Sequence, residues 1–469
     1  MDDFLKDGAC AQLARMRAGA GRAEALMRAT LERVASVNGA VNAIVSLRGE
    51  AELIAEARAV DDGPWRGALH GLPIAIKDLA DTKGLPTSQG SPVLAGRIAQ
   101  TDSLHVGRLR AAGAIVIGKT NTPEFGLGSH TYNPVHGVTR NPYAPALSCG
   151  GSSGGAAVAL ATGMLGIADG SDMMGSLRNP AGWCNVYGMR PSWGRVPADP
   201  EGDTFLHRLA TDGPMARAPQ DLALLLDVMS GPDSRQPGGL PKMRFSGLAG
   251  RISGKRIGWL ADWGGALPHE AGILPLCEEA LRVFVDLGCD VEALAPPFSR
   301  DALWEAWITL RSWSVATGLA PLMERKETRD RLKPEAIWEI ERGLALSAMQ
   351  VHRASIIRSQ WFAAAAGLFE RFDAIALPTA QVWPFAVEES WPRAIGNVAM
   401  DSYHRWMECV VPASLVGLPA GAVPAGFGAG GLPMGLQLVG AYGDDRGVLD
   451  LAEGYHRATN WPARRPPPI

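Results

Sequence analysis

Three serines between residues 149 and 178 have the surroundings of reactive groups. Ser152 and Ser153 lie in the loop G-G-S-S-G-G, and Ser176 closes a second loop, G-S-D-M-M-G-S. Serine is a poor nucleophile until a neighbouring base accepts its proton. The fold must therefore bring a base to these two loops.

Lys77 is the candidate base. It ends the apolar run L-P-I-A-I-K, which predicts a buried strand. A free lysine has a pKa of about 10.4, so action near neutral pH needs a fall of about 3 units, or about 4 kcal/mol, which burial supplies. Asp78 need not oppose this fall, because successive strand side chains point to opposite faces. The alternative is a strand-end lysine whose amine reaches solvent.

The small apolar residues 156–162 predict a buried helix, and residues 164–168 predict a short buried strand. A helix followed by a strand returns the chain to the end from which it started. The loop with Ser152 and Ser153 and the loop with Ser176 are therefore expected to meet.

Other chemistries fit the sequence less well. The nine histidines form no H-x-x-x-H or H-E-x-x-H pair. Residues 151–155 fit G-x-S-x-G with Ser153 as nucleophile. That motif requires a strand immediately before it, whereas residues 141–148 are rich in turn formers. We expect neither a metal nor an organic cofactor.

Composition describes an ordinary globular protein. Of the 469 residues, 46% are hydrophobic and 20% are charged, and the net charge of −3 gives no reason to expect nucleic acid or a membrane as a partner. Residues 1–6 lack the pattern of a secretory signal, and the six cysteines form no C-x-x-C pair, so we expect a cytoplasmic protein. The charge-free residues 409–442 are broken by prolines and predict strands and turns.

Strand and helix patterns alternate along much of the chain. They predict an α/β fold in which a central mixed, largely parallel, twisted sheet is covered by helices on both faces. Residues 195–255 are interpreted as turn-rich. Strands are predicted at 72–77, 114–117, 256–261, 290–294, 373–377, 420–424 and 434–439, and helices at 9–41, 50–61, 103–112, 270–287, 403–415 and 446–458.

We predict one domain, 1–469, with an N-terminal helical segment at about 1–60 and a helical insertion at about 300–372. The long loop at 123–147 is expected to pack over a functional region. Tryptophans in the insertion either form an apolar substrate pocket or are ordinary helix-packing residues. They are Trp304, Trp307 and Trp313.

Long motifs resemble the amidase signature family. The spacing agrees as well, with 75 residues from Lys77 to Ser152 (152 − 77) and 24 from Ser152 to Ser176 (176 − 152). The resemblance covers nearly the whole chain. The motifs are G-L-P-I-A-I-K-D at 71–78, G-K-T-N-T-P-E-F at 118–125, G-G-S-S-G-G at 150–155, G-S-D-M-M-G-S-L-R-N-P-A at 170–181, G-M-R-P-S-W-G-R-V at 188–196, D-A-I-A-L-P-T-A at 373–380 and V-P-A-S-L-V-G-L-P-A-G-A-V-P-A-G-F at 411–427.

The resemblance implies a catalytic triad and the fold of that family. Ser176 would be the nucleophile, Ser152 the serine that relays its proton, and Lys77 the base and later the acid. Family members hold the relay serine after a cis peptide bond, here Gly151–Ser152. Read without the family, the loop 150–155 could be a plain flexible loop.

The second loop would supply the oxyanion hole. The resemblance implies that it consists of the backbone N–H groups of Met173, Met174, Gly175 and Ser176. Asp172 and Arg178 would brace this loop, although the sequence alone also allows a simple surface pair. Ser153 and Met174 would contact the substrate.

Met174 departs from the family pattern, which usually has a glycine there. If that position requires a positive φ, methionine is strained. The side chain either narrows the acyl pocket or packs into a neighbouring gap in the core.

The leading hypothesis is an amide hydrolase that acts through an acyl-enzyme on a small-molecule amide. A second is the glutamine-hydrolysing subunit of a tRNA-dependent amidotransferase, which needs partner subunits. A third is a catalytically silent relative with a binding role. A homodimer stays open, as does the class of amide.

Overall fold

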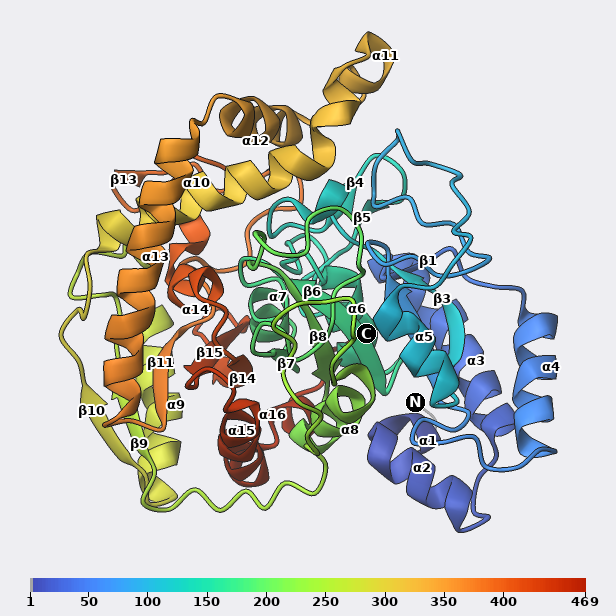
Figure 1. Cartoon of the computed structure of the whole chain (residues 1–469). Coiled ribbons are helices and arrows are strands. Elements are labelled where there is room, and N and C mark those ends of the chain that lie inside the picture. The colour runs from blue at the N-terminus through green and yellow to red at the C-terminus, as the bar shows by residue number, and fades with distance from the viewer. Residues whose placement is uncertain (1–2) are drawn as a thin grey trace.

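The computed structural model describes residues 3–469. Residues 1–2 of the predicted N-terminal segment lie outside this described part. A large mixed sheet forms the centre of the molecule (Figure 1). Its strands, in spatial order, are β10 Asp290–Ala293, β9 Arg256–Trp259, β11 Ala374–Pro378, β15 Pro433–Val439, β14 Ala420–Phe427, β7 Tyr187–Arg190, β8 Thr211–Ala216 and β6 Ile167–Asp172.

The mixed α/β architecture is confirmed, but the expected predominance of parallel pairs is wrong. Within residues 3–469, only β10–β9 and β9–β11 pair in parallel in this sheet, and every other neighbouring pair is antiparallel. The prediction assumed that each strand returns through a helix beside the last. The pair of strands expected around the glycine-rich turn is the antiparallel hairpin of β14 and β15, and β8 pairs antiparallel with both β7 and β6.

Helices cover both faces of the sheet. A side chain at Gly421 would meet Val448 of α15, whereas one at Gly188 would meet Ala181 of α7. Because Gly188 pairs with Ala422, the neighbour of Gly421, these two directions are opposite. The covering helices are α6 Gly154–Ala161 and α7 Asn179–Trp183 on one face, and α8 Pro219–Met229, α9 Ile273–Asp286 and α15 Asp445–Thr459 on the other.

A smaller three-stranded sheet carries the candidate base. Its order is β1 Ile44–Val45, β3 Ile115–Thr120 and β2 Pro73–Lys77, with β2 parallel to β3. Strand β2 lies beside β6, where the backbone N–H of Lys77 donates to Asp169 Oδ1 at 3.0 Å. This contact joins the small sheet to the edge of the large one.

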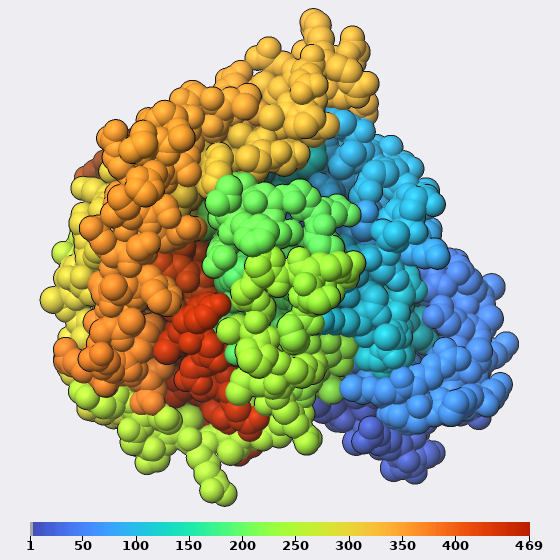
Figure 2. All heavy atoms as spheres, viewed as in Figure 1, coloured from blue at the N-terminus to red at the C-terminus, as the bar shows by residue number. Residues whose placement is uncertain are grey.

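The remaining helices frame the two sheets. In the space-filling view the helices between residues 300 and 372, yellow to orange, border one side, and the blue N-terminal segments border the other (Figure 2). They are α10 Arg300–Leu319, α11 Lys326–Arg329, α12 Pro334–Leu344 and α13 Ala348–Phe369 on the first side, and α1 Asp3–Lys6, α2 Ala9–Arg17, α3 Ala23–Val41, α4 Glu50–Asp61 and α5 Leu104–Ala111 toward the second.

Short elements complete the chain. Within residues 3–469, no helix combines the length and apolar character that crossing a membrane requires. The short elements are the 3₁₀ turns η1 Glu124–Gly126, η2 Ala320–Met323 and η3 Arg405–Val410, the ladders β4 Tyr132–Asn133 with β5 Gly137–Val138 and β12 Ala394–Ile395 with β13 Val398–Ala399, and the helices α14 Val411–Leu415 and α16 Trp461–Arg464.

Three local predictions are corrected. The strand expected at 164–168 is β6, shifted to Ile167–Asp172, because the preceding helix ends in a turn. The turn-rich interpretation of 195–255 missed β8 and α8, since Gly213 and Pro214 are poor strand formers. The helix expected at 403–415 is divided into the 3₁₀ turn η3 and helix α14.

The contact of α7 with β15 leaves no room for a side chain, which gives a test of the fold. A Cβ at Gly435 would lie 2.7 Å from the Cα of Gly182 and from Thr379 Oγ1. We expect Gly435→Ala to lower the free energy of unfolding by about 1–3 kcal/mol through overpacking. Gly430→Ala is the matched control, because a Cβ there meets no atom within 4 Å. Urea unfolding of both variants measures the difference, and equal stabilities would contradict this packing.

Candidate active site

The amine of Lys77, at the end of β2, is surrounded by serine hydroxyl groups. Its Nζ atom is 2.8 Å from Ser152 Oγ, 2.9 Å from Ser153 Oγ and 3.0 Å from Ser171 Oγ. The residue is only 1% exposed. Among residues 3–469, no carboxylate lies within ion-pair distance of this amine. The lysine is therefore buried and solvated by neutral oxygens.

This environment fits a neutral amine. A neutral amine has two N–H donors and one lone pair, so it can donate to Ser153 and Ser171 while accepting a proton from Ser152. Burial lowers the pKa of Lys77 to about 7, against the opposing attraction of Asp212, Asp169 and Asp172. Asp78 instead accepts from Ser88 Oγ at 2.6 Å.

The loop that carries Ser152 is held from outside. The Gly151–Ser152 peptide bond is cis. Ser129 Oγ donates to the carbonyl of Gly151, and Thr131 Oγ1 donates to that of Gly150 at 2.8 Å. Both donors come from the long loop at 123–147. That loop contains η1, β4 and β5, and its hydroxyl groups fix the backbone of the loop at 150–155.

The loop that carries Ser176 meets the loop at 150–155, as the sequence predicts. The backbone N–H of Ser153 donates to the carbonyl of Ser176 at 3.2 Å. Ser152 and Ser176 both line one cavity of about 250 Å³, and both side chains are largely buried. The hydroxyl that contacts the lysine and the proposed nucleophile therefore face the same space.

The amides expected to form an oxyanion hole differ from one another. Gly175 N–H donates to Asp172 Oδ1 at 2.8 Å, so the expectation that it faces an oxyanion is corrected. Within the described chain, the N–H groups of Met173, Met174 and Ser176 donate to no protein acceptor. These three amides are the candidate donors.

Comparisons with known proteins assign the chain to a family. The Amidase family model matches residues 25–449. The chain belongs to the amidase family. It is 32% identical to an acylamidase of Rhodococcus erythropolis over 94% of this chain and 93% of that protein. It is also 35% identical to a Glutamyl-tRNA(Gln) amidotransferase subunit of Thermus thermophilus, over 92% of this chain and 93% of that protein.

The fold of this amidase is also that of solved relatives. A bacterial aryl acylamidase of the amidase signature family superimposes with a TM-score of 0.91 at 29% identity, covering 98% of this chain and 99% of that one. The predicted family and fold are thereby confirmed.

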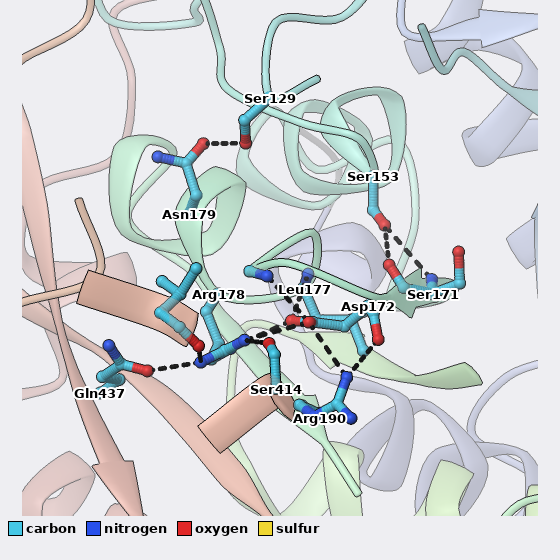
Figure 3. Close-up of polar contacts among 12 residues, drawn as sticks. Ser129, Ser153, Ser171, Asp172, Leu177, Arg178, Asn179, Arg190, Ser414 and Gln437 are labelled. Carbon is cyan, nitrogen blue, oxygen red and sulfur yellow. Dashed lines mark hydrogen bonds and ion pairs between the residues drawn. The ribbon is translucent and has the colours of Figure 1, made fainter. Parts of the chain in front are cut away.

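Asp172 organises the second loop of the amidase from a fully buried position. Its carboxylate accepts from Arg178 Nε at 3.0 Å and Nη2 at 3.1 Å, and Arg190 approaches from the other side (Figure 3). Burial alone would raise the pKa of Asp172, but the two guanidinium groups hold it well below its usual value. Asp172 and Arg178 thus form an interior ion pair rather than a surface one.

Met174 sits in the loop without backbone strain. Its φ is not positive, whereas Gly175 has φ +80°, and a Cβ at Gly175 would lie 2.9 Å from Val410. The position that requires glycine is therefore Gly175. The Met174 side chain is 3% exposed, packs against the main core and also lines the cavity. Both roles expected for it are compatible with this placement.

Apolar side chains form most of the wall of the cavity. Helix α10 supplies part of it, but through other residues than the predicted tryptophans. Trp304 and Trp307 are core residues, and Trp313 packs against His207. The apolar wall consists of Leu79, Phe125, Leu127, Met173, Met174, Ala210, Val315, Leu319 and Met407.

Sequence reasoning missed several polar neighbours. Ser171 contacts the Lys77 amine, and Arg190 shares Asp172 with Arg178. If β6 had been predicted at Ile167–Asp172, Ser171 would have been a candidate site residue, because Ser171 and Asp169 lie on the same face of that strand. Arg190 lies in a quoted motif, but its contact spans the sheet and has no local pattern.

The buried Asp172 cluster gives a stability test. Asp172→Asn leaves two buried guanidinium groups without a counter-charge, so we expect the free energy of unfolding to fall by about 3–5 kcal/mol. Asp330→Asn is the control, since the exposed pair of Asp330 with Lys326 contributes little. Thermal and urea unfolding measure both variants. An Asp172→Asn protein as stable as Asp330→Asn would contradict the cluster's role.

Proposed function

We propose that this amidase hydrolyses uncharged carboxylic amides as a stand-alone enzyme, with Ser176 as nucleophile, Ser152 as proton relay and Lys77 as base. One observation carries the proposal. The buried Lys77 amine, with a pKa of about 7, lies 2.8 Å from Ser152 Oγ beside the cavity that Ser176 lines. No step requires a cofactor.

Acylation begins with transfer of two protons. As Ser176 Oγ forms a bond to the amide carbonyl carbon, its proton passes to Ser152 Oγ, whose own proton passes to Lys77. The carbonyl π electrons move to oxygen. The amides of Met173, Met174 and Ser176 support this negative charge, because they have no other acceptor within residues 3–469.

Collapse of the tetrahedral intermediate breaks the carbon–nitrogen bond. The leaving nitrogen takes a proton from Ser152, which is replenished by the Lys77 ammonium, and the amine departs. Water then attacks the ester on Ser176 and loses its proton along the same relay. The ester bond breaks, Ser176 regains its proton, and the carboxylic acid leaves.

The lining of the cavity favours an uncharged substrate. Among the described residues, Arg311 is the charged one in the wall, but its Nε lies 2.7 Å from Glu339 Oε1, and Tyr403 shares the same pair. No net charge is left to recognise a charged substrate. The similarity to an acylamidase and to an aryl acylamidase supports the same class.

An alternative function is supported by one comparison. Because the chain is similar to an amidotransferase subunit of Thermus thermophilus, glutamine hydrolysis within a larger assembly is the second candidate. Glutamine carries charges next to its side chain, and the paired Arg311 offers them no free partner. We also propose a cytoplasmic location, and a homodimer is consistent with the stand-alone role.

The proposal is tested with the purified single chain. We expect hydrolysis of an uncharged anilide, acetanilide, to exceed hydrolysis of glutamine, because the cavity is apolar and its arginine is paired. Ser176→Ala should lose turnover by at least about a thousandfold, and Lys77→Ala nearly as much, since each removes a member of one relay. Amine release measures turnover. Mass spectrometry after acid quench should show an acyl adduct on Ser176.

Cys10→Ser is the matched control, because Cys10 is exposed and its thiol donates to the carbonyl of Gln220 on α8. Full activity of Lys77→Ala at neutral pH would reject the proposed base. Glutamine hydrolysis alone would favour the amidotransferase role. No turnover of any amide by the native chain would favour the silent relative.

A further inference from the structure

A buried charged cluster lies directly behind the Lys77 site. His105 on α5 is 2% exposed, and Asp169 on β6 is 1% exposed. The Nε2 atom of His105 lies 3.1 Å from Asp169 Oδ2, and its Nδ1 atom lies 3.5 Å from Asp212 Oδ2 on β8. Because each ring nitrogen faces a carboxylate, the arrangement suits a doubly protonated imidazolium.

The charge state of the histidine agrees with this geometry. Burial opposes protonation, but Asp212 and Asp169, with a smaller contribution from Asp199, raise the pKa of His105 to about 9. Asp212 is the outer member of the cluster, with its side chain 30% exposed. At neutral pH the imidazolium therefore stays charged between two carboxylates.

The cluster contacts β2, the strand that carries Lys77, through Asp169. Its Oδ2 atom faces His105, while its Oδ1 atom accepts the backbone N–H of Lys77 at 3.0 Å. The Asp169 carboxylate thus contacts both the His105 imidazolium and the backbone of Lys77. The third strand in this arrangement is β8, where Asp212 pairs in register with Ser171, itself in contact with the Lys77 amine.

We propose that His105, Asp169 and Asp212 form a positioning cluster for Lys77, in which Asp169 fixes the strand that carries the base and His105 offsets the two carboxylates that face it. The inference rests on the proposed function of Lys77. The cluster takes no part in bond making and acts only through the lysine.

The charges around Lys77 explain why an offset is needed. Three carboxylates act on its amine: Asp212, Asp169 and Asp172. Asp172 is already countered by Arg178 and Arg190. The His105 imidazolium counters the negative charges of Asp169 and Asp212. Without it, Asp169 and Asp212 would hold the proton on Lys77 and the amine would be a cation at neutral pH.

The test compares pH profiles of kcat/KM for acetanilide hydrolysis. The native profile is expected to rise with pH around a midpoint near 7, because Lys77 must be neutral to accept a proton. His105→Gln removes a positive charge, so its midpoint should rise by about one unit. Asp212→Asn removes a negative charge and should lower the midpoint. The double variant His105→Gln/Asp169→Asn should return toward the native midpoint.

His456→Gln is the matched control, since His456 on α15 contacts Tyr187 and should leave the midpoint unchanged. A merely structural role predicts lower kcat/KM at every pH with the native midpoint, and that result in His105→Gln and Asp212→Asn would overturn the inference. If His105→Gln does not fold, Asp212→Asn decides. If the native chain hydrolyses no amide, the proposed function fails, and NMR titration of Lys77 in the same variants still decides the inference.

Discussion

The removal of the Lys77 amine from water is the constraint on which the rest of the site depends. An amine at the end of a buried strand, contacted by serine hydroxyls and by no carboxylate of residues 3–469, is destabilised in its charged form. A direct ion pair would have kept the proton on it. The fold therefore has to keep acidic groups at a distance and satisfy the amine with neutral oxygens.

Three backbone segments from different parts of the chain come together to satisfy that requirement. Strand β2 supplies the lysine, the loop before α6 supplies Ser152 and Ser153, and β6 supplies Ser171. Close approach is possible because small residues and hydroxyl groups line these contacts. The carboxylates nearby, such as Asp172, are each engaged with buried cations, which limits their pull on the amine.

The sequence indicated the candidate reacting groups better than it indicated their surroundings. Lys77 and the two serine loops were found because each lies in a local pattern. The contacts of His105, Asp169 and Arg190 join residues far apart in sequence, and no local pattern indicates them. Strand β8 was missed because it contains a glycine followed by a proline. Only its place beside β7 shows that a small residue belongs there, since a Cβ at Gly213 would meet the carbonyl of Met189 at 2.2 Å.

The protonation state of Lys77 is measured most directly by NMR titration of the protein with ¹³C-labelled lysine side chains. Burial also lowers the pKa of Lys119 and of Lys333, each to about 8, so the resonance that disappears in Lys77→Met identifies Lys77. The account predicts that this resonance titrates with a midpoint near 7, below every other lysine. A midpoint close to the ordinary value of 10.5 would contradict it.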